Sequence, residues 1–179
     1  MTINTQLIFP LKVSCSQQFL EWINCQSSLT DKLCSAKGAV QLELIAQQWI
    51  NIDLWSQSVL DIQDVLVFQR EILMKSHDVI YWYARSIIPT RCYDLAPTFF
   101  DRLHNESIKN LIFNDQRVHR INLITYPINK HCVEFYWLKK YINRIQGILW
   151  VRIAEFSFQR KESFYLIEIL LPKLGDITL

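Results

Sequence analysis

The sequence predicts an α+β domain in which helices lie outside one antiparallel sheet of about six strands. Two strand-turn-strand segments, residues 65–89 and 149–171, predict hairpins. Helical segments are grouped around these hairpins and do not alternate with single strands, so a β-α-β architecture is not indicated. Half of the 179 residues are hydrophobic and only three are glycine, which suits a single domain over residues 1–179.

The N-terminal part is expected to open with two short helices. Ser16 precedes apolar residues at helical spacing, and Ser28 to Asp31 has the Ser-x-x-acid spacing of a helix start. Residues 40–47 alternate as a half-buried strand, with one face made of Val40, Leu42, Leu44 and Ala46. Residues 50–63 show no period and are expected to form a connection.

The remaining elements follow the same rules. The first hairpin pairs residues 65–74 with residues 79–89 around a polar loop at 75–78, and the closing hairpin pairs 149–158 with 163–171. Between them, Pro97 suits the first turn of a helix that runs to about residue 103. Asn105 is expected to cap another helix, whose apolar residues are Ile108, Leu111 and Ile112.

Two charges fall on apolar strand faces. Arg70 alternates with Phe68 and Ile72, and Glu168 lies in a run where neither face is polar. An unpaired buried ion costs several kcal/mol or becomes neutral, so each charge needs a partner. Two interpretations stay open, namely an ion pair between them or a polar ligand pocket. Arg85 alternates with apolar residues too, so a second arginine is expected to point inward.

Composition limits the function. A net charge of +2 with dispersed basic residues gives no argument for nucleic acid. No secretion signal or run of ~18 apolar residues occurs, so a soluble cytoplasmic protein is expected. The five cysteines lack a Cys-x-x-Cys pair and are expected to be reduced thiols. No metal or cofactor is expected, because nucleotide motifs are missing and no ligand spacing occurs around His77, His104, His119 and His131.

Four ordered blocks resemble the chorismate lyase (chorismate pyruvate-lyase) family. They are residues 28–30 (Ser-Leu-Thr), 68–73 (Phe-Gln-Arg-Glu-Ile-Leu), 81–89 (Tyr-Trp-Tyr-Ala-Arg-Ser-Ile-Ile-Pro) and 166–172 (Leu-Ile-Glu-Ile-Leu-Leu-Pro), with a weaker fifth block at 103–113. The resemblance runs from about residue 19 to residue 172. It implies conversion of chorismate to 4-hydroxybenzoate and pyruvate, the first committed step of ubiquinone biosynthesis, without a cofactor.

The resemblance also implies a site. Arg70 would hold the ring carboxylate together with the backbone of Leu29 and Ile108, and Glu168 would contact the ring oxygen that becomes the phenol. Leu29 and Ile108 both lie near expected helix starts, which suit an anion. These helices would be flaps over a buried pocket, with slow product release and product inhibition. Arg85 is either the contact of the enolpyruvyl carboxylate or a salt bridge that braces the sheet.

Three features depart from the family pattern. Lys109 stands where a glycine is usual, Glu155 stands where a basic residue is usual, and the segment 117–148 is longer. Within that segment, an amphipathic helix is expected to pack on the sheet or to contact a membrane surface transiently for product hand-off. Its apolar face is Trp137, Leu138, Tyr141 and Ile145, opposite Lys139, Lys140 and Arg144.

The chain is expected to be a monomer that binds chorismate. The alternative function is a non-catalytic effector or sensor module, because the same fold serves as the effector domain of some bacterial transcription regulators. Those regulators usually carry a DNA-binding winged helix before this domain. About 15 residues precede the first expected helix here, which favours the enzyme.

Overall fold

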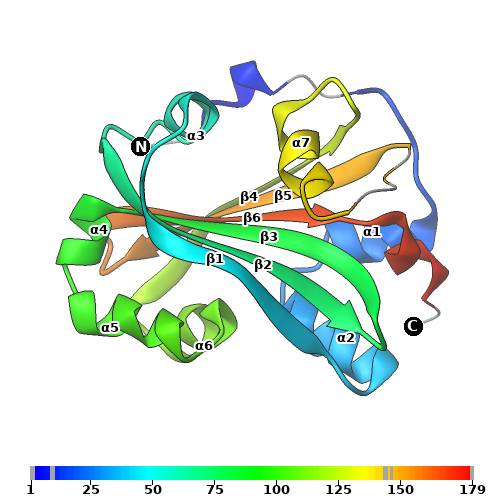
Figure 1. Cartoon of the computed structure of the whole chain (residues 1–179), viewed down its shortest axis with the longest axis horizontal. Helices are drawn as coiled ribbons and strands as arrows, with labels where there is room; N and C mark the ends of the chain where they lie inside the picture. The colour runs from blue at the N-terminus through cyan, green and yellow to red at the C-terminus, as the bar shows by residue number, and fades with distance from the viewer. Residues whose placement is uncertain (1–2, 9–10, 143–144, 146, 178–179) are drawn as a thin grey trace.

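Six strands form one antiparallel sheet in the order β1-β2-β3-β6-β5-β4 (Figure 1). The structure is a computed structural model that describes residues 3–8, 11–142, 145 and 147–177. The strands are β1 (Gln41–Asn51), β2 (Leu66–Ser76), β3 (Val79–Pro89), β4 (Val118–Ile128), β5 (Leu149–Phe158) and β6 (Glu162–Leu170). The predicted α+β class with about six antiparallel strands is therefore confirmed.

Helices cover both faces of this sheet. On one side lie α1 (Gln17–Ile23), α2 (Leu29–Lys37), α5 (Pro97–Asp101) and α6 (Ile108–Asn114), with α4 (Thr90–Asp94) at one end. On the other side lie α3 (Leu54–Val59) and α7 (Val133–Lys139). The part of the chain that the structure describes also contains three short 3-10 helices, namely Thr5–Leu7, Arg102–His104 and Pro172–Asp176. No helix in the described part of the chain is long and apolar enough to span a membrane.

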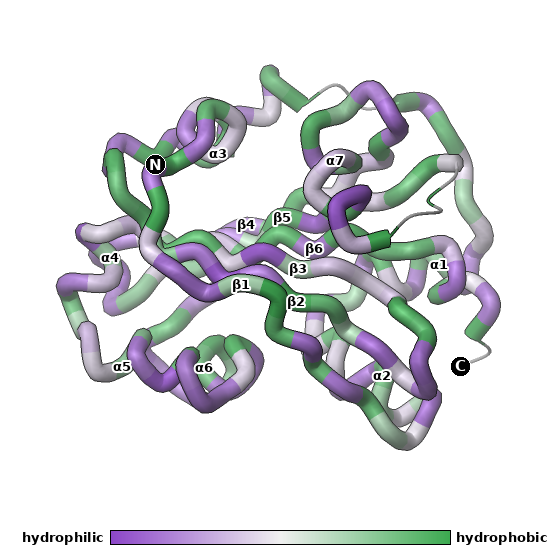
Figure 2. The backbone as a smooth tube through the Cα atoms, viewed as in Figure 1, coloured by the Kyte–Doolittle hydropathy of each residue, from purple (hydrophilic) through white to green (hydrophobic). Residues whose placement is uncertain are grey.

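Both faces of the sheet bury an apolar core, because successive strand residues point to opposite sides. The first core joins the side chains of Ile72, Trp82, Phe156 and Leu166 to α1, α2, α5 and α6. The second core joins Leu73, Tyr83, Ile153 and Ile167 to α7 and to residues around α3. Hydrophobic segments accordingly occur in the sheet and in the elements on both of its sides (Figure 2).

The two predicted hairpins are present with tight turns. His77 and Asp78 connect β2 to β3 with φ of 46° and 63°, and Gln159 and Arg160 begin the turn between β5 and β6 with φ of 53° and 58°. Positive φ at consecutive turn residues matches the right-handed twist of the paired strands. The turns therefore fix the registers β2–β3 and β5–β6 from local sequence.

Helix starts were predicted with mixed success. The side chains of Ser16 and Ser28 accept the backbone N–H groups of Phe19 and Asp31, as expected of caps. The connection expected at 50–63 contains α3, because the Asp53 side chain caps it by accepting the N–H of Ser56 at 2.6 Å. The helix α6 begins after Ser107, so Asn105 as its cap is wrong.

The segment 117–148 also differs from expectation. It contains the strand β4, which was not predicted, and α7 ends at Lys139. The predicted helical face through Ile145 is therefore wrong, and Arg144 lies outside the described residues. The side chains of Trp137 and Leu138 are buried in the second core, so the packed interpretation of this apolar face is confirmed.

Two β-bulges change which side chains face the first core. The register of β1 against β2 shifts between Leu44 and Ala46, and that of β4 against β5 shifts between Arg120 and Asn122. A bulge inserts one residue and so inverts the alternation beyond it. As a result Gln47 lies opposite Arg70, and Arg120 lies opposite Phe156. Gln47 was expected on the face away from Leu42, which is wrong for this reason.

Candidate active site

A cavity of about 50 Å³ lies between the first face of the sheet and the starts of α2 and α6. Its floor is apolar and includes Ile72, Met74, Trp82, Ala84, Ala154 and Leu166. Its mouth is formed by residues 27–30 and 107–109. The lining contains four charged side chains, which are Lys109, Arg120, Arg152 and Glu168. The cavity is therefore an apolar slot with more positive than negative groups.

Glu168 is buried at this cavity and faces Arg152, its register partner on β5. Arg152 Nε lies 3.3 Å from Glu168 Oε2. The other two nitrogens of this guanidinium donate to the carbonyls of Trp22 at 2.8 Å and Cys25 at 3.0 Å. Burial raises the pKa of Glu168, although the charges of Arg152 and Arg120 oppose that shift. Arg152 thus fixes the carboxyl group and ties it to the end of α1.

Arg70 is buried on the same face of the sheet, and only 5% of its surface is exposed. Its Nε donates to Gln47 Oε1 at 2.9 Å, and Gln47 Nε2 lies 2.7 Å from His104 Nδ1. Among the described residues no carboxylate forms a salt bridge with Arg70. Burial lowers the pKa of its guanidinium. The ion pair between Arg70 and Glu168 is therefore wrong, since Glu168 pairs with Arg152.

Arg70 lies one row of side chains away from Glu168. The register Ile72–Ala84–Glu168 crosses two strand spacings, and Arg70 is two residues along β2 from Ile72. These offsets, about 10 Å and about 7 Å, place the two Cα atoms ~12 Å apart. Arg70 does not itself line the cavity, whereas Leu166 and Ala154 of its row do. For one ligand to contact both Arg70 and Glu168, the cavity must therefore lengthen along the strands by one row of side chains, toward Arg70.

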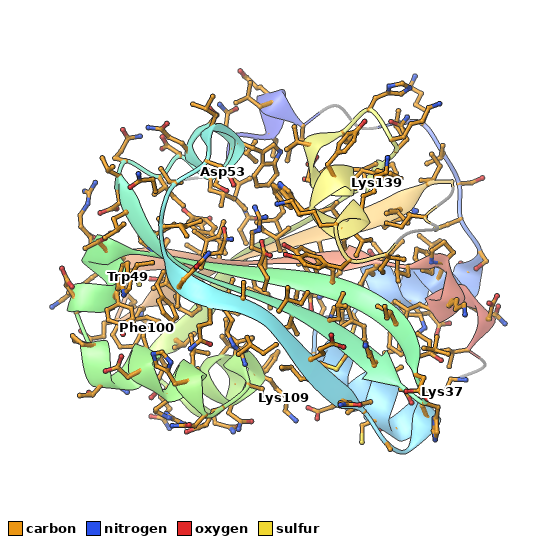
Figure 3. The ribbon with its side chains drawn as sticks, viewed as in Figure 1. Lys37, Trp49, Asp53, Phe100, Lys109 and Lys139 are labelled. Carbon is orange, nitrogen blue, oxygen red and sulfur yellow. The ribbon has the colours of Figure 1, made fainter. Side chains whose placement is uncertain are left out.

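Leu29 and Ile108 are the first residues of α2 and α6, and both line the cavity. N–H groups in a first helical turn have no partner within the helix. The Lys109 side chain forms a salt bridge with Asp31, which joins the two helix starts. Lys109 lies on the side of the sheet opposite Asp53 (Figure 3). The two helix starts therefore form a linked cover over the cavity.

Comparisons with known proteins identify the family of the chain. The sequence model described as Chorismate lyase matches residues 9–176, nearly the whole chain. The chain belongs to the chorismate lyase family. Among curated proteins, none matches its sequence.

The fold is shared with bacterial regulators of low sequence identity. A GntR-family transcriptional regulator from Bacillus cereus is 16% identical, with a TM-score of 0.55, over 75% of this chain and 92% of that one. The effector domain of PhnF from Mycobacterium smegmatis is 15% identical, with a TM-score of 0.55, over 82% and 90%. These values establish a common fold between this chorismate lyase family member and those regulators.

Arg85 lies on the opposite face of the sheet, against the second core. It donates to Glu71 at 2.7 Å and to Asp53 at 3.1 Å, and its guanidinium carbon lies 3.8 Å from the ring centroid of Trp137. Glu71 also accepts the hydroxyl of Tyr141 at 2.7 Å. A contact between Arg85 and a ligand at Glu168 is therefore wrong. Arg85 instead forms the salt bridges with Glu71 and Asp53 that brace the sheet.

The two unusual residues of this chorismate lyase family member have separate effects. Glu155 pairs with Tyr165 in the register and so lies on the second face, where it accepts the Ser163 hydroxyl at 2.9 Å. Burial raises its pKa. Glu155 therefore does not enter the cavity, whereas Lys109 contributes directly to its cover.

Two cationic residues of the cavity were missed. Arg152 interrupts the apolar alternation of β5, which is the signal that identified Arg70 on β2. Arg120 has no such signal, because the bulge in β4 inverts the face on which alternation would place it. No cluster of three or more His, Cys, Asp or Glu side chains suited to a metal occurs within residues 3–8, 11–142, 145 and 147–177.

Proposed function

We propose that this protein converts chorismate to 4-hydroxybenzoate and pyruvate, as the first committed step of ubiquinone biosynthesis. The observation that carries the proposal is a buried Arg70 without a carboxylate partner among the described residues, on the sheet face that also holds Glu168. A buried cation of this kind is costly unless an anion compensates it. A ring carboxylate of the substrate supplies that anion.

In the proposed complex the ring spans the two charges. Its carboxylate contacts the guanidinium of Arg70 and the backbone N–H groups of Leu29 and Ile108, at the ends of the cover. Its hydroxyl contacts Glu168, which Arg152 holds in place. Two long side chains and a six-membered ring fit the ~12 Å between the Cα atoms of Arg70 and Glu168. The apolar floor receives the ring faces.

The reaction needs orientation and charge balance more than a nucleophile. The ether bond between the ring and the enolpyruvyl oxygen breaks, a ring proton leaves, and the ring becomes aromatic. The released enolpyruvate takes up a proton and becomes pyruvate. Arg70 and Glu168 hold the two ends of the ring, and the apolar walls exclude water. Aromatisation supplies the driving force.

The cover must open for substrate and product. A cavity of about 50 Å³ holds at most a few water molecules. The starts of α2 and α6 therefore have to separate to admit a ring. Closure around the product makes release slow and 4-hydroxybenzoate inhibitory.

The direct test is to mix the purified protein with chorismate and to measure 4-hydroxybenzoate and pyruvate by chromatography. Equal amounts of both products, formed faster than in a buffer control, are expected. Stabilisation by 4-hydroxybenzoate is measured in parallel as a rise in melting temperature. Absence of turnover would contradict the proposed lyase activity.

A second candidate function is a non-catalytic effector module. It is favoured by the likeness to the effector domain of PhnF and to the GntR-family regulator. The two candidates differ in one outcome. A sensor binds 4-hydroxybenzoate or a related anion and raises the melting temperature, but leaves chorismate unchanged.

A further inference from the structure

Three cations line the cavity, and two of them form salt bridges within the described residues. Lys109 pairs with Asp31 in the cover. Arg152 pairs with Glu168 and donates to two backbone carbonyls. Arg120 differs, because the partners recorded for it in the described part of the chain bind one nitrogen only. One edge of its guanidinium therefore remains for a ligand.

Arg120 lies opposite Phe156, two rows of side chains from Glu168, and its side chain reaches back along the cavity. The charge of Arg120 opposes the rise in the pKa of Glu168. Its guanidinium donates to the backbone and side-chain oxygens of Gln26 at 2.8 Å and 2.7 Å. Gln26 lies in the loop between α1 and α2, next to the Cys25 carbonyl that Arg152 binds. Both arginines thus approach the same loop from neighbouring strands. A bulge that turns a cation onto a cavity suits a binding role.

The structure assigns to Arg120 a subsite for a second carboxylate, next to the ring oxygen at Glu168. This inference rests on the proposed function. In chorismate the enolpyruvyl ether and the hydroxyl occupy adjacent ring carbons, so the side-chain carboxylate lies near the hydroxyl end. The ring carboxylate at Arg70 lies at the far end. The assignment replaces Arg85, which the sheet separates from the cavity.

The subsite discriminates substrate from product. The substrate carries two carboxylates and the product 4-hydroxybenzoate carries one, so Arg120 contributes to the first complex only. The second carboxylate leaves as part of pyruvate, so the remaining product makes fewer contacts at the Glu168 end of the cavity. Arg120 is therefore a specificity residue that acts before the ether bond breaks and has no role in holding the product.

The experiment compares two ligands and three variants. Dissociation constants are measured by calorimetry for 4-hydroxybenzoate and for 3-(carboxymethoxy)-4-hydroxybenzoate, which adds an ether-linked carboxylate at the adjacent position. The variants are Arg120→Gln, Arg120→Lys and the control Arg117→Gln. Arg117 is also partly exposed and precedes β4, but it pairs with Asp115 and does not line the cavity. KM for chorismate is measured in parallel.

We expect Arg120→Gln to weaken binding of the dicarboxylate about 10- to 100-fold and to change binding of 4-hydroxybenzoate less than twofold. Arg120→Lys is expected to recover part of the loss, and Arg117→Gln to match the wild type. KM for chorismate should rise with the dicarboxylate dissociation constant. The subsite would be overturned if Arg120→Gln weakened binding of both ligands equally, or if it weakened binding of neither.

The binding measurements separate this inference from the proposed function. If the wild type forms no product from chorismate but Arg120→Gln still weakens binding of the dicarboxylate, the proposed lyase activity is refuted and the proposed subsite stands. If the wild type turns over chorismate, and the Arg120→Gln variant keeps the wild-type KM for chorismate and affinity for the dicarboxylate, the subsite is refuted and the proposed lyase activity stands.

Discussion

Arg152 Nε and Glu168 Oε2 lie 3.3 Å apart, on directly opposed residues of β5 and β6. This pair explains how Glu168 can be buried without help from Arg70. It also means that the two charges proposed to hold the ligand are energetically separate, so each can be altered without stranding the other.

Arg70→Met is expected to abolish turnover while leaving the fold intact. Arg70 has no carboxylate partner among the described residues, so its removal strands no buried charge. Gln47 loses one hydrogen bond, which costs about 1 kcal/mol. Activity and thermal unfolding measured on the same preparation check the prediction.

Arg85→Met is the matched control for that variant. The same substitution on the next strand leaves Glu71 buried without its cation, and one unpaired buried charge costs about 3–5 kcal/mol. We expect a large fall in melting temperature and, for the folded fraction, retained affinity for 4-hydroxybenzoate. If Arg70→Met unfolds the protein as severely as Arg85→Met, the binding role of Arg70 is refuted.

Glu168→Gln separates hydrogen bonding from proton transfer. An amide oxygen can still accept a hydrogen bond from the ring hydroxyl, so a loss in kcat of only ~10- to 100-fold is expected, or about 1.4 to 3 kcal/mol. Glu168→Ala should lose more. Steady-state kinetics of both variants decide the role, since equal and near-total losses would indicate that the carboxyl group transfers a proton.

The acid limb of the activity profile should report Glu168. Burial raises its pKa above the ordinary 4.5, so the carboxylate and the activity are lost at a higher pH than for an exposed glutamate. Arg152→Gln removes a charge that opposes this shift and should move the limb to higher pH. Arg117→Gln should leave it in place. A limb that does not move would exclude Glu168 as the titrating group.

The same raised pKa has a consequence for stability. The folded protein binds the proton of Glu168 more tightly than the unfolded chain does, so the free energy of unfolding falls as pH rises between the two pKa values. Glu168→Gln removes this dependence. Melting temperatures of wild type and variant from pH 4 upward test the sign, and a difference that is constant with pH would contradict it.

The salt bridge between Lys109 and Asp31 is expected to slow product release. Asp31→Asn breaks the link between the starts of α2 and α6 and should raise the dissociation rate of 4-hydroxybenzoate. Both side chains are partly exposed, so the effect should be under about fivefold and should diminish in high salt. Stopped-flow displacement measures it. Slower release in the variant would show that the bridge does not hold the cover closed.

Local sequence determined the fold class and the burial of the two charges. The turn residues at 77–78 and 159–160 set the hairpins, and alternation along β2 and β6 placed Arg70 and Glu168 among apolar side chains. Both are properties of a single strand or of two strands joined by a short turn. They need no knowledge of distant contacts, which is why the sequence was sufficient.

Tertiary structure decided which charges share a cavity. Alternation shows that Arg70 and Arg85 both point inward, but a sheet covered on two faces has two interiors, and only strand pairing assigns each side chain to one of them. The register places Glu71 opposite Arg85 and so directs Arg85 away from Glu168. The bulges in β1 and β4 then invert the alternation and bring Gln47 to Arg70 and Arg120 to the cavity. A bulge depends on pairing between strands, so the sequence of one strand did not predict it.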